Sequence, residues 1–158
     1  MTARLLLVLL CGALAACSSF DAEWRAAADR TTAHGPTRWD GRWTSEKHRT
    51  LRGEPAGGRL RCVLTEAATN CFPAKSPARP AQALRASFRA NWKIFASDYT
   101  MTLTPLSGSR TDFRGTHELP AIFGGTYRYT AHIAGDRLTA RYDSSYDCGT
   151  FDLTRVRP

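Results

Sequence analysis

The sequence predicts an all-β fold, a barrel of roughly eight antiparallel strands in up-and-down order. Three observations predict it. After residue 37, apolar and polar residues alternate with a period of two in a series of short runs. Glycine-containing turn sequences such as Gly57-Gly58, Gly108 and Gly124-Gly125 separate these runs. No long run with helical spacing follows residue 37, which favours a barrel or a sandwich.

The first 16 residues have the organisation of a secretory signal. Arg4 gives a positive start, residues 5–14 form an apolar run, and Ala15-Ala16 place small side chains before Cys17. A run of about ten residues is too short to cross the roughly 30 Å apolar core of a bilayer as a helix. We therefore expect residues 1–16 to be a cleaved signal peptide.

Leu14-Ala15-Ala16-Cys17 resembles the lipobox of bacterial lipoproteins. The resemblance implies that Cys17 becomes a lipidated N-terminus, which joins the protein to a membrane through acyl chains such as palmitate. Ser18 stands where an Asp would resemble an inner-membrane retention signal, so the expected location is the outer membrane of the cell envelope, facing the periplasm. The alternative is an ordinary signal peptide that ends near a cysteine.

Residues 17–37 are expected to be a lipidated N-terminus and a flexible tether. The segment is polar and shows no clear apolar face. An alternative is a short helix over 21–32, favoured by the alanines at 26–28 and ended by His34-Gly35-Pro36. The β-barrel domain is expected over residues 38–158.

Each expected strand is recognised by a set of apolar residues at alternate positions. The run from Leu84 to Ile94 is the longest, and the proline-rich residues 68–81 predict a longer loop. In chain order the inward-facing sets are Trp39, Gly41 and Trp43; Leu60, Cys62 and Leu64; alternate residues of 84–94; Tyr99, Met101 and Leu103; Phe113, Gly115 and His117; alternate residues of 127–133; Leu138, Ala140 and Tyr142; and Phe151 and Leu153.

Gly41-Arg42-Trp43 in the first strand resembles the Gly-x-Trp motif that opens lipocalins and related eight-stranded barrels. In that superfamily an arginine near the end of the barrel packs over the tryptophan. Arg155 has the same parity as Phe151 and Leu153, so the resemblance implies that Arg155 stacks on Trp43 and closes one barrel end. The other short motifs of true lipocalins are missing, so the expectation is a lipocalin-like barrel.

Residues 39–157 also resemble a family of small uncharacterised bacterial proteins. The resemblance covers most of the expected domain and implies no known activity. The matching segments are Gly58 to Cys62, Phe88 to Tyr99, Gly124 to Tyr129 and Tyr142 to Phe151.

Three of the five cysteines remain after the signal peptide and the lipid attachment site are set aside. An exported domain permits disulfides. Cys62 shares the parity of apolar neighbours, Cys71 lies in the expected loop, and Cys148 has outward parity. The preferred pair is Cys71–Cys148, with Cys62 as a small buried side chain. A bulge near Gly149 would favour Cys62–Cys148 instead.

The chain has 22 Lys and Arg against 14 Asp and Glu, a formal net charge of +8. Export and the scattered placement of the arginines argue against nucleic acid as a partner. Attraction to anionic headgroups is the expected consequence of the charge.

No motif for a reaction is present, and we expect no catalytic residue, no metal site and no cofactor. The four histidines lack metal-ligand spacing. Asp143 and Asp147 flank a polar segment, which allows the alternative of a hydrolase using paired carboxylates with a histidine. We expect instead a polar turn before the last strand, and His117 as a buried or rim residue.

The expected function is that of an envelope lipoprotein whose barrel binds a small apolar or amphipathic ligand, or which has a structural role in the envelope. Phe88, Trp92, Tyr127 and Tyr129 are predicted to face inward, where aromatic side chains either fill a small barrel or surround one ligand. The alternative is a protein-interaction or inhibitor module at the envelope.

Overall fold

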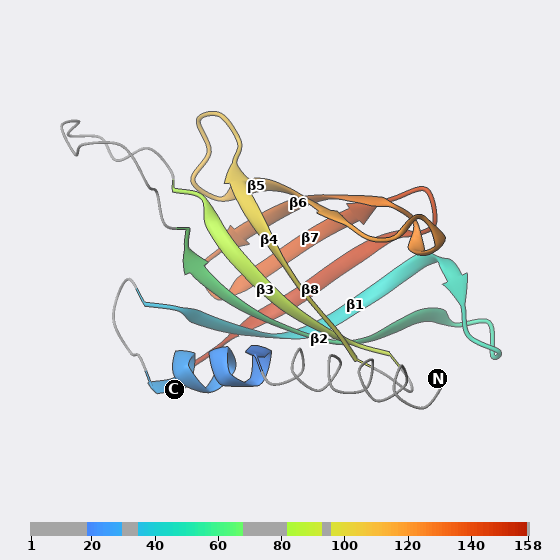
Figure 1. Cartoon of the computed structure of the whole chain (residues 1–158), viewed down its shortest axis with the longest axis horizontal. Coiled ribbons are helices and arrows are strands. Elements are labelled where there is room, and N and C mark those ends of the chain that lie inside the picture. The colour runs from blue at the N-terminus through green and yellow to red at the C-terminus, as the bar shows by residue number, and fades with distance from the viewer. Residues whose placement is uncertain (1–18, 30–34, 68–81, 93–95, 158) are drawn as a thin grey trace, which may run out of the picture.

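The computed structural model describes residues 19–29, 35–67, 82–92 and 96–157. Eight strands and one short 3-10 helix follow one another, with an N-terminal helix over residues 19–29 before them (Figure 1). The elements are β1 (Thr37–Arg49), β2 (Pro55–Glu66), β3 (Leu84–Asn91), β4 (Ala96–Pro105), β5 (Asp112–Glu118), η1 (Ala121–Phe123), β6 (Thr126–Ala134), β7 (Arg137–Asp143) and β8 (Cys148–Val156).

The strands form a closed antiparallel barrel in simple sequence order. Each strand pairs with the next, and β8 returns to pair with β1, where Trp43 lies opposite Phe151. Closure leaves no free sheet edge of the kind that open sheets must protect. The eight-stranded up-and-down barrel predicted from the period-two alternation is confirmed.

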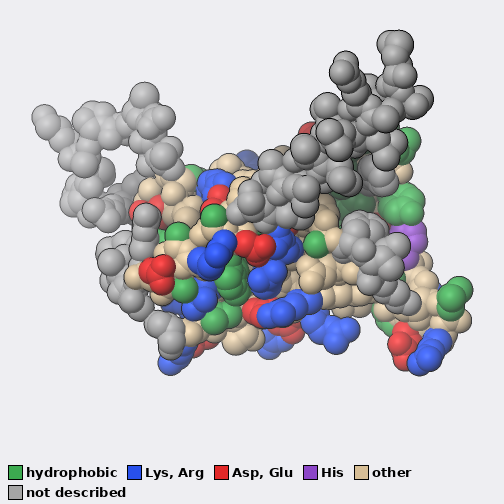
Figure 2. Space-filling view, turned by 60° about the horizontal axis from the view of Figure 1, so that its bottom comes forward, with side chains coloured by type: hydrophobic (Ala, Val, Ile, Leu, Met, Phe, Trp, Pro, Cys, Tyr) green, Lys and Arg blue, Asp and Glu red, His purple; other side chains and the backbone are tan. Residues whose placement is uncertain are grey.

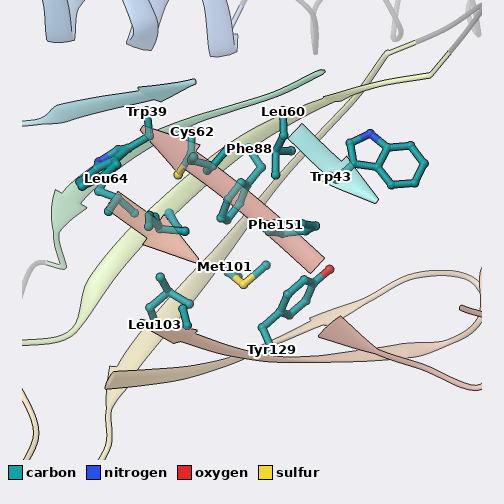
Figure 3. Close-up of a cluster of buried hydrophobic side chains, with 14 of the residues drawn as sticks. Trp39, Trp43, Leu60, Cys62, Leu64, Phe88, Met101, Leu103, Tyr129 and Phe151 are labelled. Atoms are coloured by element: carbon teal, nitrogen blue, oxygen red, sulfur yellow. The ribbon is translucent and has the colours of Figure 1, made fainter. Parts of the chain in front are cut away.

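The inward side chains pack into one apolar cluster that runs along the barrel (Figure 3). Trp39 and Trp43 lie at its opposite ends, 3% and 4% exposed. Cys62 is fully buried among these side chains, as expected from its parity. At about 25 cal/mol per Å² of apolar surface, this burial is the main stabilising contribution to the fold.

The glycine of the Gly-x-Trp motif has a steric reason. A Cβ at Gly41 would lie 2.1 Å from the carbonyl oxygen of Asp152 in β8. Only glycine therefore allows β8 to approach β1 at this position and close the barrel. Gly58 serves the same purpose between β2 and β3, because a Cβ there would lie 1.9 Å from the carbonyl oxygen of Asn91.

The expected flexible tether is wrong for residues 19–29, which form a helix against the outer face of β2. Phe20, Trp24 and Ala27 are spaced as one helical face, and they cover Val63, an outward residue that is only 2% exposed. The sequence contained this spacing, but two large apolar side chains in eleven residues were too few to distinguish it from a polar spacer. Cys17 and residues 30–34 lie outside the described residues.

Arginines and carboxylates hold the helix in place. Arg89 of β3 is 7% exposed and bonds to Asp98 at 2.7 Å and to Asp21 of the helix at 2.7 Å. Its guanidinium also lies 5.0 Å from the ring centroid of Phe20. Arg85 pairs with Glu23. Figure 2 shows basic and acidic side chains interspersed on the face of the molecule that carries the helix.

The loops divide between two ends of the barrel, which we call the Trp43 end and the Trp39 end. The Trp43 end carries the connections β1–β2, β3–β4, β5–β6 and β7–β8. The Trp39 end carries the connections β2–β3, β4–β5 and β6–β7. The helix begins near Arg89 and ends towards Arg38 at the start of β1, so its first residues are the ones nearer the Trp43 end.

Candidate ligand cleft between strands 4 and 5

The barrel wall is weakest between β4 and β5. Their aligned pairing is limited to two positions, Thr104 with Arg114 and Pro105 with Phe113, next to the connecting loop. In contrast, β3 and β4 stay in register from Leu84 to Asn91. Beyond Arg114 no aligned pair joins the two strands, although Gly115 remains close to Thr102, so backbone ladder bonds do not seal this separation.

A cleft of about 840 Å³ opens to the outside at this separation. Outward threonines and arginines of β3 to β6 form its sides, and the inward residues Met101 and Tyr129 are reached at its floor. The volume lies in the range typical of small-molecule sites, about 300–1,000 Å³. The lining residues are Ala67, Arg85, Thr100, Met101, Thr102, Thr104, Arg114, Gly115, Thr116, Arg128, Tyr129 and Thr130.

Two of the three arginines at the cleft are available to a ligand. Arg85 is bonded to Glu23 at 2.9 and 3.2 Å. In the described part of the chain no ion pair is found for Arg114 or Arg128, although Asp143 is the cross-strand neighbour of Arg128. Both project among threonine hydroxyls, so the sides of the cleft offer positive charge and hydrogen-bond donors to an anionic group.

His117 joins β5 to β4 where the backbone pairing has ended. The centroid of its imidazole ring lies 5.0 Å from that of the Tyr99 ring in β4. Burial lowers the pKa of His117 from its ordinary value of 6.5. The half-buried imidazole therefore joins β5 to β4 through its ring contact, where the expectation was a buried or a rim residue.

Tyrosine hydroxyls gather behind the floor of the cleft. Burial raises the pKa of the Tyr99 and Tyr129 phenols. The Tyr142 hydroxyl donates a hydrogen bond to the Asp147 carboxylate at 2.8 Å. Burial, and to a smaller extent this bond, raises the pKa of Tyr142. The phenols are therefore neutral, and the interior polar groups satisfy one another.

The four aromatic residues predicted to line a central cavity are divided by the structure. Phe88 and Tyr129 are buried in the core cluster, and the centroid of each ring lies 5.8 Å from that of the Phe151 ring. Tyr127 packs against the same cluster. Trp92 is not inside the barrel: it is 43% exposed because β3 ends at Asn91 and the alternation ends with it. Of the four, only Tyr129 reaches the cleft.

The predicted stacking of Arg155 on Trp43 is wrong. Arg155 lies opposite Trp39, four residues along β8 from the partner of Trp43, and is exposed. Four residues of strand are about 13 Å, beyond the reach of a stacked guanidinium. Trp43 is covered instead by Trp92, with ring centroids 4.3 Å apart, and its indole N–H donates to the carbonyl of Asn91.

The two carboxylates considered for acid–base chemistry have different surroundings. Asp143 is exposed, whereas Asp147 is buried and accepts hydrogen bonds from Ser45 at 2.6 Å and Tyr142 at 2.8 Å. His48 Nε2 is 4.0 Å from the Asp147 carboxylate and has no hydrogen-bond partner among the described residues, while the backbone N–H of His48 donates to the Ser45 hydroxyl at 2.8 Å. Because Ser45 is only 1% exposed, this cluster fastens β1 to the polar turn before β8 and presents no nucleophile to a substrate.

The predicted disulfides are not formed in the structure. Cys62 and Cys148 are both free thiols, which rules out the Cys62–Cys148 pair here. Cys148 lies 3.8 Å from Glu46 at the barrel surface, while Cys71 lies outside the described residues. Cys62 has the parity of the inward residues of β2, and Cys148 has the parity of the outward residues of β8. Without a β-bulge the two side chains therefore lie on opposite faces of the barrel wall.

Two features are absent from the described residues, a metal-ligand cluster and a membrane-spanning helix. These residues contain no group of three or more His, Cys, Asp or Glu side chains arranged to hold a metal ion. Over the same residues, no helix combines the length and the apolar character required for a bilayer crossing.

Comparisons with known proteins identified no relative. No protein-family model matches the chain. No curated protein matches it, and no solved structure matches it.

Sequence reasoning missed the residues of the cleft. Thr100, Thr102, Arg114, Thr116 and Arg128 alternate with apolar residues, and most polar residues with this alternation lie on the solvated face of a sheet. Their special position depends on where two strands stop pairing, and no local pattern in the sequence marks that point.

Proposed function

We propose that this protein is a lipid-anchored protein of the bacterial envelope that binds a small amphipathic molecule with an anionic head in the cleft between β4 and β5. The observation that carries the binding proposal is the cleft itself, about 840 Å³ with arginine and threonine sides and an apolar floor. Arg114 and Arg128 would receive the anionic head, while Met101 and Tyr129 would contact the apolar chain.

The packed interior supports the cleft over a central cavity. The inward aromatic side chains contact one another along the barrel, as in the 5.2 Å stack of Phe88 on Tyr99. A ligand in the centre would have to displace this packing, whereas the cleft offers space without disturbing it.

Binding is tested with myristate and the neutral 1-tetradecanol as matched probes in titration calorimetry and native mass spectrometry. We expect the native protein to bind myristate more tightly than the alcohol. Arg114→Gln combined with Arg128→Gln should weaken myristate binding about 10- to 100-fold, since hydrogen bonds to charged groups contribute about 1.5–3 kcal/mol. Arg137→Gln is the matched control, an outward arginine of β7 paired with Asp152 and outside the cleft. Equal binding by all three proteins would contradict the proposal.

The anchor is tested by the intact mass of the protein recovered from a bacterial membrane fraction. We expect a chain that has lost residues 1–16 and gained acylated glyceryl on Cys17, and Cys17→Ser should remove the added mass. A recovered chain that begins elsewhere or has no lipid would refute the anchor without affecting the cleft.

A further inference from the structure

Exposed large apolar side chains concentrate at the Trp43 end of the barrel. Among the described residues five such side chains are exposed, and four lie at this end, one on each of its four loops. Leu51 is 106% exposed on the β1–β2 hairpin, Ile122 79% in η1, Tyr146 55% before β8 and Trp92 43% after β3. In Figure 2 hydrophobic side chains are visible at the right-hand side, where Figure 1 has the β1–β2 hairpin.

Single exposed apolar residues are normal, but their distribution here is one-sided. The Trp39 end has one, Leu106, at 38%. Antiparallel topology brings four loops that are far apart in sequence to the same end, and each presents an apolar tip there. Two loops present an aliphatic tip, Leu51 and Ile122, and the other two present an aromatic tip, Trp92 and Tyr146. Side chains that enter a membrane interface typically have this composition.

The N-terminal helix directs the chain to the same end. Phe20 lies against Arg89 of β3. Trp92 follows Arg89 by three positions, one of them beyond the end of β3, which corresponds to about 10 Å of extended chain. Cys17 lies two positions before Ser19, the first described residue of the helix, and two positions extend over about 7 Å at most. The ion pairs of Asp21 and Glu23 hold the helix on the barrel, so an anchor at Cys17 would be tied close to the Trp43 end.

We propose that the four apolar tips of the Trp43 end enter the headgroup region of the bilayer that carries the anchor, so that the barrel stands end-on against the membrane. The inference rests on the proposed lipid anchor. A bilayer surface accommodates separate projecting side chains, whereas a protein partner would need a continuous face of about 1,000 Å² or more in total buried area. Residues 46–54 of the β1–β2 hairpin carry three basic residues, Lys47, Arg49 and Arg52, against two acidic ones, Glu46 and Glu54. Glu46 is paired with Arg141 of β7, so the remaining charge of the hairpin is basic and suits anionic headgroups.

The test compares tryptophans placed at the two ends of the full chain. In a Trp92→Phe background, Ile122→Trp reports from the Trp43 end and Leu106→Trp from the Trp39 end, and both positions are exposed. The proteins are purified from a bacterial membrane in detergent and reconstituted into phosphatidylcholine–phosphatidylglycerol vesicles containing lipids with brominated acyl chains. Flotation shows whether the protein is anchored, and bromine quenching shows which end lies at the bilayer.

We expect both variants to float, with fluorescence at least twofold more quenched for Ile122→Trp than for Leu106→Trp. Flotation with equal or absent quenching would overturn the end-on orientation while leaving the anchor intact, and would leave the tips free for a protein partner. Failure of both variants to float would refute the proposed anchor, and the inference with it. Replacing phosphatidylglycerol by phosphatidylcholine should reduce the quenching of Ile122→Trp if the basic hairpin contributes.

Discussion

The wall around β1, β2 and β3 and the seam between β4 and β5 belong to one barrel but are held by different means. Around β1 the pairing is long on both sides, glycines allow close backbone approach, and a helix covers the outer face. At the seam two aligned pairs and the side chain of His117 connect the strands, and a cleft reaches the core. Closure of a barrel can thus be complete in topology and uneven in strength, and the weaker part is where a ligand can reach the interior.

The largest effect expected from this difference concerns core side chains on the two sides. Leu60 in β2 is fully buried, whereas Met101 in β4 is 4% exposed and borders the cleft. Leu60→Ala should lower the free energy of unfolding by about 3–5 kcal/mol and Met101→Ala by about 2 kcal/mol, because a cavity next to the cleft can fill or relax. Urea unfolding of both variants measures the difference, and an equal loss would mean that the seam is as tightly packed as the wall.

A second difference separates a buried ion pair from an exposed one. Arg89 forms a two-bond pair with Asp98 beneath the helix, and Arg59 forms one with Asp40 on the surface. Arg89→Met should cost about 2–3 kcal/mol, since it leaves Asp98 without its charged partner in a partly buried position. Arg59→Met is the control and should cost less than about 1 kcal/mol.

The same variant should also release the helix. Trp24 lies against Arg38 and Arg61 in the docked helix, so its fluorescence reports docking if compared with a Trp24→Phe reference. We expect faster proteolysis within residues 19–29 for Arg89→Met than for Arg59→Met. Identical proteolysis would show that the apolar packing and the Arg85–Glu23 ion pair hold the helix without Arg89.

The smallest expected effect is the response of the seam to acid. The pKa of His117 is lower in the folded protein than its ordinary value of 6.5, so the unfolded chain binds more protons as the pH falls. The stabilising contribution of the neutral imidazole is therefore complete above pH 6.5 and is lost as the pH falls below it. Amides of β4 and β5 should show less protection from hydrogen exchange at pH 5.5 than at pH 7.5, after correction for the intrinsic rate.

Two histidine variants distinguish this explanation from a general acid effect. His117→Gln should remove most of the pH dependence of the seam. His132→Gln should retain it, because His132 is exposed and pairs with Asp112 at the paired end of β5, five residues from His117. Unchanged acid sensitivity in His117→Gln would show that another group controls the opening of β4 from β5.

Local patterns predicted the barrel because they follow from elementary strand geometry. Alternation of Leu60, Cys62 and Leu64 and of Tyr99, Met101 and Leu103 identifies the buried face of each strand without knowledge of its neighbours. Short connections between successive runs then favour pairing in sequence order. The same parity placed Cys62 in the core and predicted Trp43 as buried, both confirmed.

Predictions that required contact between distant residues were less successful. Arg155 has the parity expected for stacking, but the register of β8 places it opposite Trp39. Trp92 continues the alternation of β3 in sequence, yet β3 ends one residue before it. Register and strand ends are set by the sum of pairing and packing over neighbouring strands, which one strand's sequence does not contain.

By itself, the sequence determined the fold class and the inward faces of the strands. Only the tertiary structure decided that residues 19–29 dock as a helix, that β4 and β5 separate into a cleft, and that four loops bring apolar tips to one end. The reason is physical. Period and composition are properties of single segments, whereas a cleft and a shared surface exist only once segments distant along the chain are packed in a fixed register.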